Sequence, residues 1–225
     1  MKQLILFVLT FLPLTASADA VKIDGIYYNL NAELHQAEVT SSPDNYSGSV
    51  NIPDKVTYES VEYSVTSIGY NAFIDCSDLT SVTIPNSVTS IGFQAFAYCK
   101  ITTITIPHSV TSIEYGAFMC SDITSVFIPE NVTSIDNEAF YCCDKLNSVT
   151  ISDGVTSIGT YAFYRCRDLI SITIPGSVSS IGSGAVNYCN GLCLVIVKNQ
   201  TPSTIDRSTF SNRVNATLYV PKGSK

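Results

Sequence analysis

A short motif, Val-Thr-Ser-Ile, recurs along most of this chain at a nearly fixed spacing. It begins at Val65, Val88, Val110, Val132 and Val155, and the variant Val-Ser-Ser-Ile begins at Val178. Successive copies are 23, 22, 22, 23 and 23 residues apart. A fixed period of this length indicates a solenoid, in which the units stack because none of them can bury its apolar side chains alone.

Two other series of residues keep the same period. Ala-Phe pairs begin at Ala72, Ala95, Ala117, Ala139 and Ala162, with Ala-Val at Ala185. Ile-Pro pairs begin at Ile84, Ile106, Ile128 and Ile174, with Ile-Ser at Ile151. Because three series stay in register, we interpret residues 65–197 as one stack of repeats.

Each repeat is expected to begin with a strand. In the unit that starts at Leu79, the apolar residues Leu79, Val82 and Ile84 are separated by Thr and Ser, which predicts a short strand with one buried face. Pro85 ends this strand because proline cannot donate to a β-ladder. A second short strand is expected over residues 88–91.

The remainder of the unit is expected to form a corner. Gly92 breaks the second strand, and Ala95, Phe96 and Cys99 have the spacing of side chains on one side of a single helical turn. The sequence therefore predicts a mostly β solenoid with coils of 22–23 residues. Each coil would contain a strand, a second short strand and a short helical turn.

The consensus of these units is L-x-x-V-x-I-P-x-x-V-x-x-I-G-x-x-A-F-x-x-C. It resembles the BspA-type leucine-rich repeat of surface and secreted proteins from anaerobic gut and oral bacteria and some mucosal protozoa. The flanks are similar too: residues 22–28 with 61–64 resemble the family's N-terminal β-cap, and residues 216–221 its C-terminal closing strand. The resemblance implies a cap over residues 19–64, a leucine-rich-repeat solenoid over 65–197 and a C-terminal cap over 198–225. Since family members often continue further, this last cap would be either a natural short form or a truncated copy.

The first residues have the features of a secretory signal peptide. Lys2 precedes an apolar run from Leu4 to Leu14, and small residues follow at Ala16 and Ala18. This run is far shorter than the ~20 residues that a membrane-spanning helix needs. We therefore predict cleavage after Ala18 and a secreted or cell-surface protein.

The net charge and the apolar content of the chain limit the kinds of partner it is expected to bind. Removing residues 1–18 leaves 11 basic and 19 acidic residues, a net charge of −8, which argues against nucleic acid. After Leu14 the chain has no apolar run of membrane-spanning length. The expected partner is an extracellular protein or glycoprotein, with host matrix proteins as one class; the oligomeric state is not predicted.

The cysteines repeat with the coils. A stacked ladder of buried thiols is predicted at Cys76, Cys99, Cys120, Cys143, Cys166 and Cys189. Parallel neighbours about 4.8 Å apart do not match the ~3.8 Å Cβ separation of a disulfide, so we expect free thiols acting as small hydrophobes. Cys142 and Cys193 fall out of phase, and a Cys189–Cys193 bridge stays open as an alternative.

Motifs that would indicate catalysis or metal binding are missing from the sequence. It contains no C-x-x-C pair, nucleophile elbow, phosphate loop or H-E-x-x-H motif, and its only histidines are His35 and His108. His108 is expected to be a solvated turn residue. Acids such as Asp136, Glu138, Asp144 and Asp168 could in principle serve glycoside hydrolysis, but a solenoid corner supplies no cleft for such a pair. We predict no enzyme activity, no cofactor and no metal.

The candidate contact residues lie on a surface of Thr and Ser that two apolar residues interrupt. The positions equivalent to Thr80, Ser81 and Thr83 should face outward, and Phe127 and Ile170 place large apolar side chains there. Isolated exposed apolar residues are common, but apolar anchors on a polar face are also typical of interfaces. The predicted ligand contacts are Phe127, Ile170, Thr105 and Thr150, and a secondary surface is predicted at the corner tyrosines Tyr98, Tyr141, Tyr164 and Tyr188.

Two functions fit this pattern. The first, implied by the resemblance, is a non-catalytic adhesion module that recognises host or microbial surface macromolecules. The second is a structural spacer or surface-display rod without a specific ligand. A carbohydrate-active enzyme or a sugar-binding accessory is a third hypothesis. A spacer should keep its exposed repeat positions uniform, whereas a binding module should show a few that break the pattern.

Overall fold

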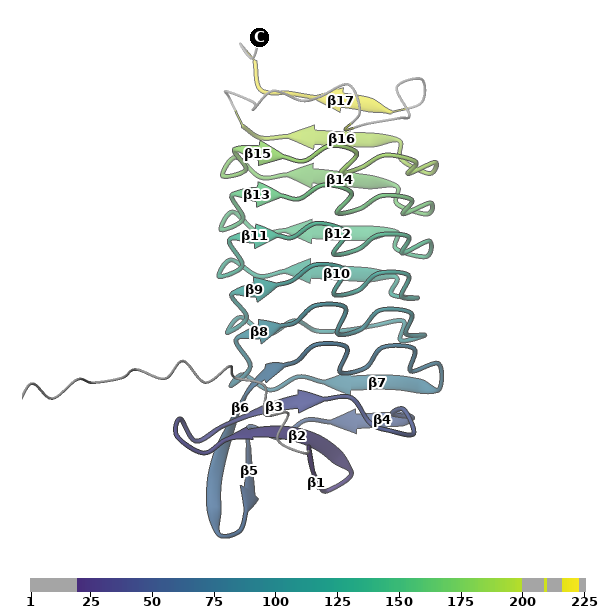
Figure 1. Cartoon of the computed structure of the whole chain (residues 1–225). Helices are drawn as coiled ribbons and strands as arrows, with labels where there is room; N and C mark the ends of the chain where they lie inside the picture. The colour runs from purple at the N-terminus through teal and green to yellow at the C-terminus, as the bar shows by residue number, and fades with distance from the viewer. Residues whose placement is uncertain (1–19, 200–208, 210–215, 223–225) are drawn as a thin grey trace, which may run out of the picture.

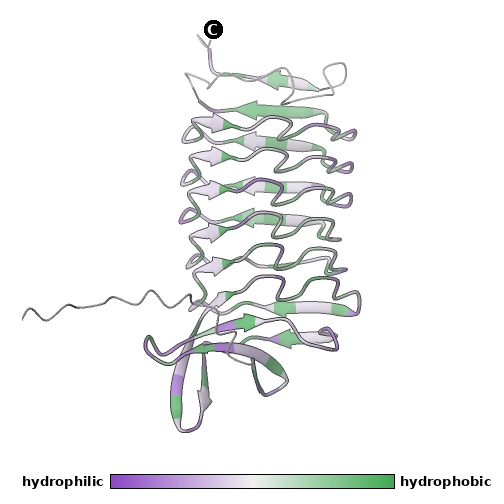
Figure 2. Cartoon of the chain, viewed as in Figure 1, coloured by the Kyte–Doolittle hydropathy of each residue, from purple (hydrophilic) through white to green (hydrophobic). Residues whose placement is uncertain are grey.

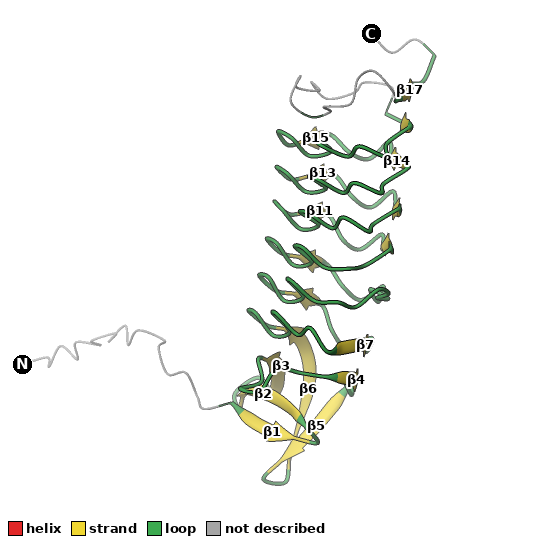
Figure 3. Ribbon diagram, turned by 90° about the vertical axis from the view of Figure 1, so that its right-hand side faces the viewer, coloured by secondary structure: helices red, strands yellow, loops and turns green. Residues whose placement is uncertain are grey.

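The computed structural model describes residues 20–199, 209 and 216–222. The predicted signal peptide lies outside these residues, as does much of the predicted C-terminal cap. Within them the chain forms strands and turns and no helix, and the coils stack as a tower on an N-terminal β-cap (Figures 1 and 3). The predicted β-solenoid architecture is confirmed, except for the helical turn.

Two parallel sheets run along the tower (Figure 1). The short Ser-Ile strands form one of them, in the order β6 (Val61–Ile68), β8 (Ser90–Ile91), β9 (Ser112–Ile113), β11 (Ser134–Ile135), β13 (Ser157–Ile158) and β15 (Ser180–Ile181). The other sheet, here called the long-strand sheet, contains β10 (Ser125–Ile128), β12 (Ser148–Ile151), β14 (Ser171–Ile174), β16 (Leu194–Val197) and β17 (Thr217–Tyr219). Equivalent residues pair across the coils, as Phe127 does with Thr150.

Strand alternation follows the sequence. In β10 the side chains of Val126 and Ile128 are buried and those of Ser125 and Phe127 are exposed. Successive strand residues point to opposite faces, so one register fixes which residues enter the core of every coil. Figure 2 shows the apolar stretches concentrated on the strands and the polar ones at many of the turns.

The corner of each coil is not a helical turn, and this part of the prediction is wrong. Its first and fifth residues have left-handed backbone angles, for example Gln94 (φ 50°) and Tyr98 (φ 60°). The N–H groups alternate between two kinds of partner: Ala95 and Ala97 donate three residues back within the coil, whereas Gln94, Phe96 and Tyr98 donate to carbonyls of the next coil. In a helix the N–H groups donate to carbonyls of the same helix. In these paired tight turns about half of the N–H groups donate to the next coil instead, and so join the coils.

The residues assigned to the interior of the corner are nevertheless buried. Five phenylalanines form a continuous stack, with ring centroids 4.9–5.3 Å apart and planes within 5° of parallel: Phe73, Phe96, Phe118, Phe140 and Phe163. Tyr46 from the cap contacts Phe73 at one end, at a centroid distance of 4.8 Å. Val186 occupies the same position in the following coil and is also buried.

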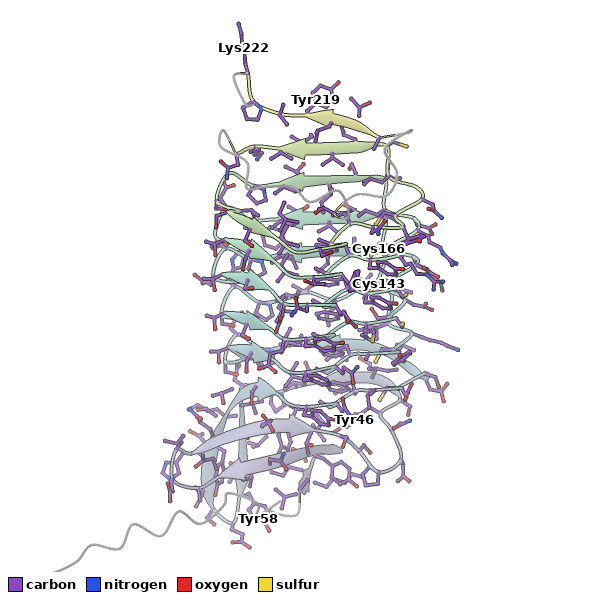
Figure 4. The ribbon with its side chains drawn as sticks, turned by 45° about the horizontal axis from the view of Figure 1, so that its top comes forward. Tyr46, Tyr58, Cys143, Cys166, Tyr219 and Lys222 are labelled. Carbon is purple, nitrogen blue, oxygen red and sulfur yellow. The ribbon has the colours of Figure 1, made fainter. Side chains whose placement is uncertain are left out.

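The cysteine ladder lies beside this stack. Four of its Sγ atoms donate a hydrogen bond to the phenylalanine carbonyl of the previous coil, from Cys99 to Phe73 (2.8 Å), Cys143 to Phe118 (3.0 Å), Cys166 to Phe140 (3.2 Å) and Cys189 to Phe163 (3.1 Å). Cys76 is buried at the first rung, and all eight cysteines are free thiols. Figure 4 shows Cys143 and Cys166 one above the other, with Tyr46 near the cap.

Cys120 does not belong to the ladder, contrary to the prediction. Ser121 occupies the rung: it is buried, and its Oγ lies 3.5 Å from the Cys143 Sγ. Cys120 is instead the left-handed fifth residue of its corner, where it is only half-buried. This repeat has 22 residues rather than 23, and the residue it lacks falls after the corner, because Phe118 and the turn around it keep their places in the stack.

The N-terminal cap joins the solenoid through shared strands. β1 (Val21–Ile23), β2 (Ile26–Asn31) and β3 (Gln36–Thr40) form an antiparallel meander, and β3 then pairs in parallel with β6. β5 (Lys55–Tyr58) pairs with the first half of β6, and β4 (Gly48–Asn51) pairs with β7 (Leu79–Thr83). The predicted boundary between residues 64 and 65 falls inside β6, so one strand serves both the cap and the first coil.

Candidate ligand-binding surfaces

The outward face of the long-strand sheet carries one group of candidate residues. Thr105, Phe127 and Thr150 are exposed and lie side by side on three successive coils, since Thr103 bridges to Ser125 and Phe127 pairs with Thr150. The Phe127 side chain is 43% exposed. A bulky ring therefore projects between two threonines, as the strand alternation predicts.

The Phe127 ring has neighbours that the sequence interpretation missed. The His108 ring lies 5.9 Å from it, and His108 Nδ1 lies 3.1 Å from the Glu130 carboxylate. A hydrogen bond within Glu130 and the His108 contact lower the pKa of the Glu130 carboxyl. His108 and Glu130 each follow the Ile-Pro pair of their coil, so the repeat register itself was the signal that could have paired them.

Ile170 is exposed but lies apart from Phe127. Its side chain is 58% exposed, and its neighbours across the coils are Asn147 and Cys193, to which its backbone is hydrogen-bonded. Ile170 is in the second coil after that of Phe127. Within its own coil it lies three residues before the position that corresponds to Phe127. The structure therefore does not bring the two apolar candidates together into one patch.

The corner tyrosines form two adjacent columns rather than one. Tyr141 and Tyr164 stack at 5.0 Å with planes 5° apart, and Tyr164 meets the edges of Tyr188 at 5.2 Å and Tyr161 at 5.1 Å. Tyr98 and Tyr188 belong to the other column, which is formed by the fifth corner residues with their left-handed backbone angles. Their side chains are 47% and 52% exposed. Tyr98 lies against Met119, with its hydroxyl 3.8 Å from the sulfur.

A third aromatic column was missed from the sequence. Tyr70, Phe93 and Tyr115 stack on successive coils, with centroids 5.3 and 5.1 Å apart. Tyr70 is 65% exposed, and Glu138, which accepts a hydrogen bond from the Tyr115 hydroxyl, raises the pKa of Tyr115 to about 12. Each of the three is the second residue after a Ser-Ile strand, a regularity that was visible in the repeat.

All of these rings lie at the corner of their coil, between the Ser-Ile strand and the ladder position, and we call this group the aromatic corner. It consists of Tyr70, Phe93, Tyr98, Tyr115, Tyr141, Tyr161, Tyr164 and Tyr188. Because many of the rings stack on one another, a ligand would meet mainly their edges and hydroxyl groups. Stacked tyrosines lose little conformational freedom when a partner binds, and tyrosine is enriched at protein interfaces.

The acidic residues near the corner are held in surface interactions. Asp122 lies 2.8 Å from the Lys145 Nζ, and Asp144 lies 3.4 Å from the Arg167 guanidinium. Within the described part of the chain, no three His, Cys, Asp or Glu side chains gather in an arrangement that could hold a metal ion. One open depression is lined by Asp78, Thr80 and Lys100.

None of the residues that the structure describes belongs to a helix long and apolar enough to cross a membrane.

The fold and its stacked surfaces define the class of protein as a leucine-rich-repeat solenoid. A model of the BspA-type leucine-rich-repeat region matches residues 49–170 and 133–223, in six copies. The chain therefore belongs to the BspA-type leucine-rich-repeat family. A comparison with curated proteins gives no match.

Solved structures of bacterial proteins share the fold. A leucine-rich cell surface protein from Faecalibacterium prausnitzii is 30% identical over 83% of this chain, with a TM-score of 0.65. The chain spans 56% of that protein's length. The pneumococcal vaccine antigen PcpA is 23% identical over 79% of this chain and 49% of its own, with a TM-score of 0.64. A Bacteroides ovatus leucine-rich-repeat protein is 23% identical over 91% of this chain and 77% of its own, with a TM-score of 0.55.

Proposed function

We propose that this chain is a non-catalytic extracellular binding module whose partner is a protein or glycoprotein. The observation that supports it best is the aromatic corner, where eight rings project along successive coils. Extended solenoid surfaces suit large protein partners, and aromatic side chains supply much of the energy of protein interfaces. The description of the Faecalibacterium relative as a cell surface protein supports the extracellular location.

The aromatic corner is the proposed principal contact surface. Its columns follow the axis of the stack, where coils repeat about every 4.8 Å, so an elongated polypeptide could contact several coils at once. The phenol hydroxyls can donate to backbone carbonyls and accept from N–H groups of such a partner. The long-strand sheet is the proposed second surface: Phe127 lies there between Thr105 and Thr150, and Ile170 lies apart from them, two coils further on.

A spacer function competes with this proposal. A rod without a ligand needs only uniform exposed positions, but the column through Thr105, Phe127 and Thr150 is interrupted by a ring. The aromatic corner also changes character along the stack, because Tyr70, Phe93 and Tyr115 are followed by Asn137 and Thr160. Such variation at fixed repeat positions favours recognition.

Surface plasmon resonance of the purified chain over immobilised collagen, laminin, fibronectin and fibrinogen, and over whole bacterial cells, tests the proposal. Saturable binding to at least one of them is expected, whereas binding to none would favour the spacer.

Export is the second testable part of the proposal. We expect secreted material to begin at Asp19, since Ala16 and Ala18 fit the small-residue positions of a cleavage site. Intact-mass measurement of the protein from the culture medium checks this. A mass that includes Met1 would contradict it.

A further inference from the structure

Cys120 and Cys142 are the two cysteines that the ladder does not use and that occupy equivalent positions on adjacent coils. Both are the fifth residue of a corner, with φ of 54° and 55°. The Cys120 N–H donates to the Tyr141 carbonyl and the Cys142 N–H to the Tyr164 carbonyl, both at 2.7 Å, which holds the two residues in parallel register. Their side chains therefore leave neighbouring coils in the same direction.

The surroundings of this pair differ from those of the ladder. Each ladder thiol from Cys99 onward is enclosed in the core and donates to a phenylalanine carbonyl, whereas Cys120 and Cys142 are only half-buried. Burial and the neighbouring Cys142 thiol raise the pKa of Cys120 to about 11, and burial also raises the pKa of Cys142, although the nearby Arg165 opposes that shift. The two thiols are thus close enough to influence each other's ionisation.

We propose that Cys120 and Cys142 are a modification site, at which a small-molecule disulfide oxidises the pair to an intramolecular disulfide that joins two coils. Neighbouring coils about 4.8 Å apart bring the Cα atoms within the 4.4–6.8 Å range of disulfides. The Cβ atoms must approach by roughly 1 Å, which these half-buried corner side chains can do more easily than the enclosed ladder thiols. The site rests on the proposed extracellular location, because disulfides persist in oxidising compartments.

The reaction is a thiol–disulfide exchange in two steps. The Cys142 thiolate attacks one sulfur of the small disulfide, forming a mixed disulfide and releasing one small thiol. The Cys120 thiolate then attacks the Cys142 sulfur and releases the second small thiol. Two protein thiols are oxidised, and the small disulfide is reduced to two thiols that take up the protons.

The bond would lie within the aromatic corner. Tyr98 contacts Cys120, and Tyr141 contacts Cys142, as their mutual influence on ionisation indicates. Joining the two coils would fix the spacing between these tyrosines. It would also close a loop of 22 residues, which restricts the unfolded chain.

The test uses the folded full chain and oxidised glutathione. After incubation at mildly alkaline pH, free thiols are alkylated and the protein is digested without reductant for mass spectrometry. The expected product is a peptide pair linked through Cys120 and Cys142, together with an increase in Tm of roughly 5 °C that a reductant reverses. Cys193, which is exposed and donates to the Gly191 carbonyl, is the matched control and should carry only glutathione.

A Cys120→Ser variant provides the second measurement. Without its partner, Cys142 should accumulate as the glutathione mixed disulfide, whereas Cys193→Ser should leave the Cys120–Cys142 link unchanged. Recovery of Cys120 and Cys142 as alkylated thiols, or as separate glutathione adducts in the unsubstituted chain, would overturn the proposal. Neither readout depends on ligand binding, so the outcome is independent of the proposed contact surface.

Discussion

At the scale of single residues, the ladder cysteines act as hydrogen-bond donors in an otherwise apolar interior. The Cys99 and Cys143 thiols reach the phenylalanine carbonyls of the previous coil at 2.8 and 3.0 Å. Buried polar groups are costly without a partner, so each thiol satisfies a carbonyl while filling the space of a small hydrophobe. A stack of coils can repeat this arrangement indefinitely because donor and acceptor belong to adjacent coils.

Stability should therefore fall at alkaline pH. Burial raises the pKa of the Cys99 and Cys143 thiols to about 12, whereas an unfolded cysteine titrates near ~8.5. The folded state binds these protons more tightly than the unfolded state does. The contribution of each thiol to the free energy of unfolding is therefore complete below pH ~8.5 and is lost as the pH rises toward 12. The loss is up to ~1.4 kcal/mol per pH unit for each thiol. Thermal unfolding from neutral to alkaline pH, compared between the chain and Cys143→Ala, measures this.

The Cys143→Ala variant should be less stable at neutral pH but should lose stability less steeply above it. Tyr46, whose pKa burial also raises to about 12, is common to both proteins and does not affect their difference. If stability falls equally steeply with pH in the two proteins, the assignment of the Cys143 thiol to the buried ladder is contradicted.

Among the rungs that the structure describes, Ser121 is the one that lacks a thiol. Its buried Oγ has the Cys143 sulfur at 3.5 Å as its hydrogen-bonding neighbour. Ser121→Cys should stabilise the chain by about 1 kcal/mol, because a thiol is more apolar and can donate to the Phe96 carbonyl as the other rungs do. Urea unfolding checks this against Ser125→Cys, an exposed position that should show no gain. A loss of stability on Ser121→Cys would show that this rung is too narrow for sulfur.

At the scale of elements, the turns decide how closely the coils approach. A Cβ at Gly154 would overlap the Glu130 carbonyl oxygen of the previous coil, whereas a Cβ at Gly176 would lie 3.7 Å from the Lys198 oxygen, an ordinary contact. The two glycines stand in equivalent turns of adjacent coils. Comparing the two therefore distinguishes the need for close packing against the neighbouring coil from a general preference for glycine in turns.

Gly154→Ala should therefore cost about 2 kcal/mol or more, since a backbone oxygen cannot move aside as a side chain could. Gly176→Ala is the matched control and should change the free energy of unfolding by less than about 0.5 kcal/mol. Both are measured by chemical denaturation. Similar costs for the two substitutions would mean that the coils can separate locally at Gly154.

The strands could be predicted from the sequence more fully than the corners. Alternation places Val126 inward and Phe127 outward without any knowledge of neighbouring coils. The corner spacing correctly buries Phe96, but it cannot distinguish a helical turn from two tight turns with left-handed residues such as Tyr98. That choice depends on hydrogen bonds to the next coil, which the residues of one repeat do not specify.

The same limit explains the errors at the candidate surfaces. The spacing of the cysteines predicts that Cys120 belongs to the ladder, but the burial of Ser121 depends on where the 22-residue repeat lacks a residue. His108 was expected to be a solvated turn residue, and it is exposed, yet its contact with Glu130 comes from the next coil. Both features appear only when the repeats are aligned with each other in space.

At the scale of the whole molecule, one core runs from the cap through every coil. Tyr46 continues the phenylalanine stack into the cap, and β6 belongs to both the cap and the first coil. Interactions between neighbouring coils hold such a structure together, and its outer surfaces are left free to vary. The aromatic corner uses this freedom, because its residues change along the stack while the core residues repeat.

The most direct test of the account is the affinity of corner variants for whichever immobilised protein or cell surface binds the chain. Tyr141→Ser with Tyr164→Ser should weaken Kd by tenfold or more, since loss of a buried interface anchor costs more than ~1 kcal/mol. Phe127→Ser with Ile170→Thr is the matched comparison on the second surface, and thermal unfolding confirms that each variant is folded. Unchanged affinity in the folded tyrosine variant, with or without a loss in the Phe127 and Ile170 variant, would contradict the proposal that the aromatic corner is the principal contact surface.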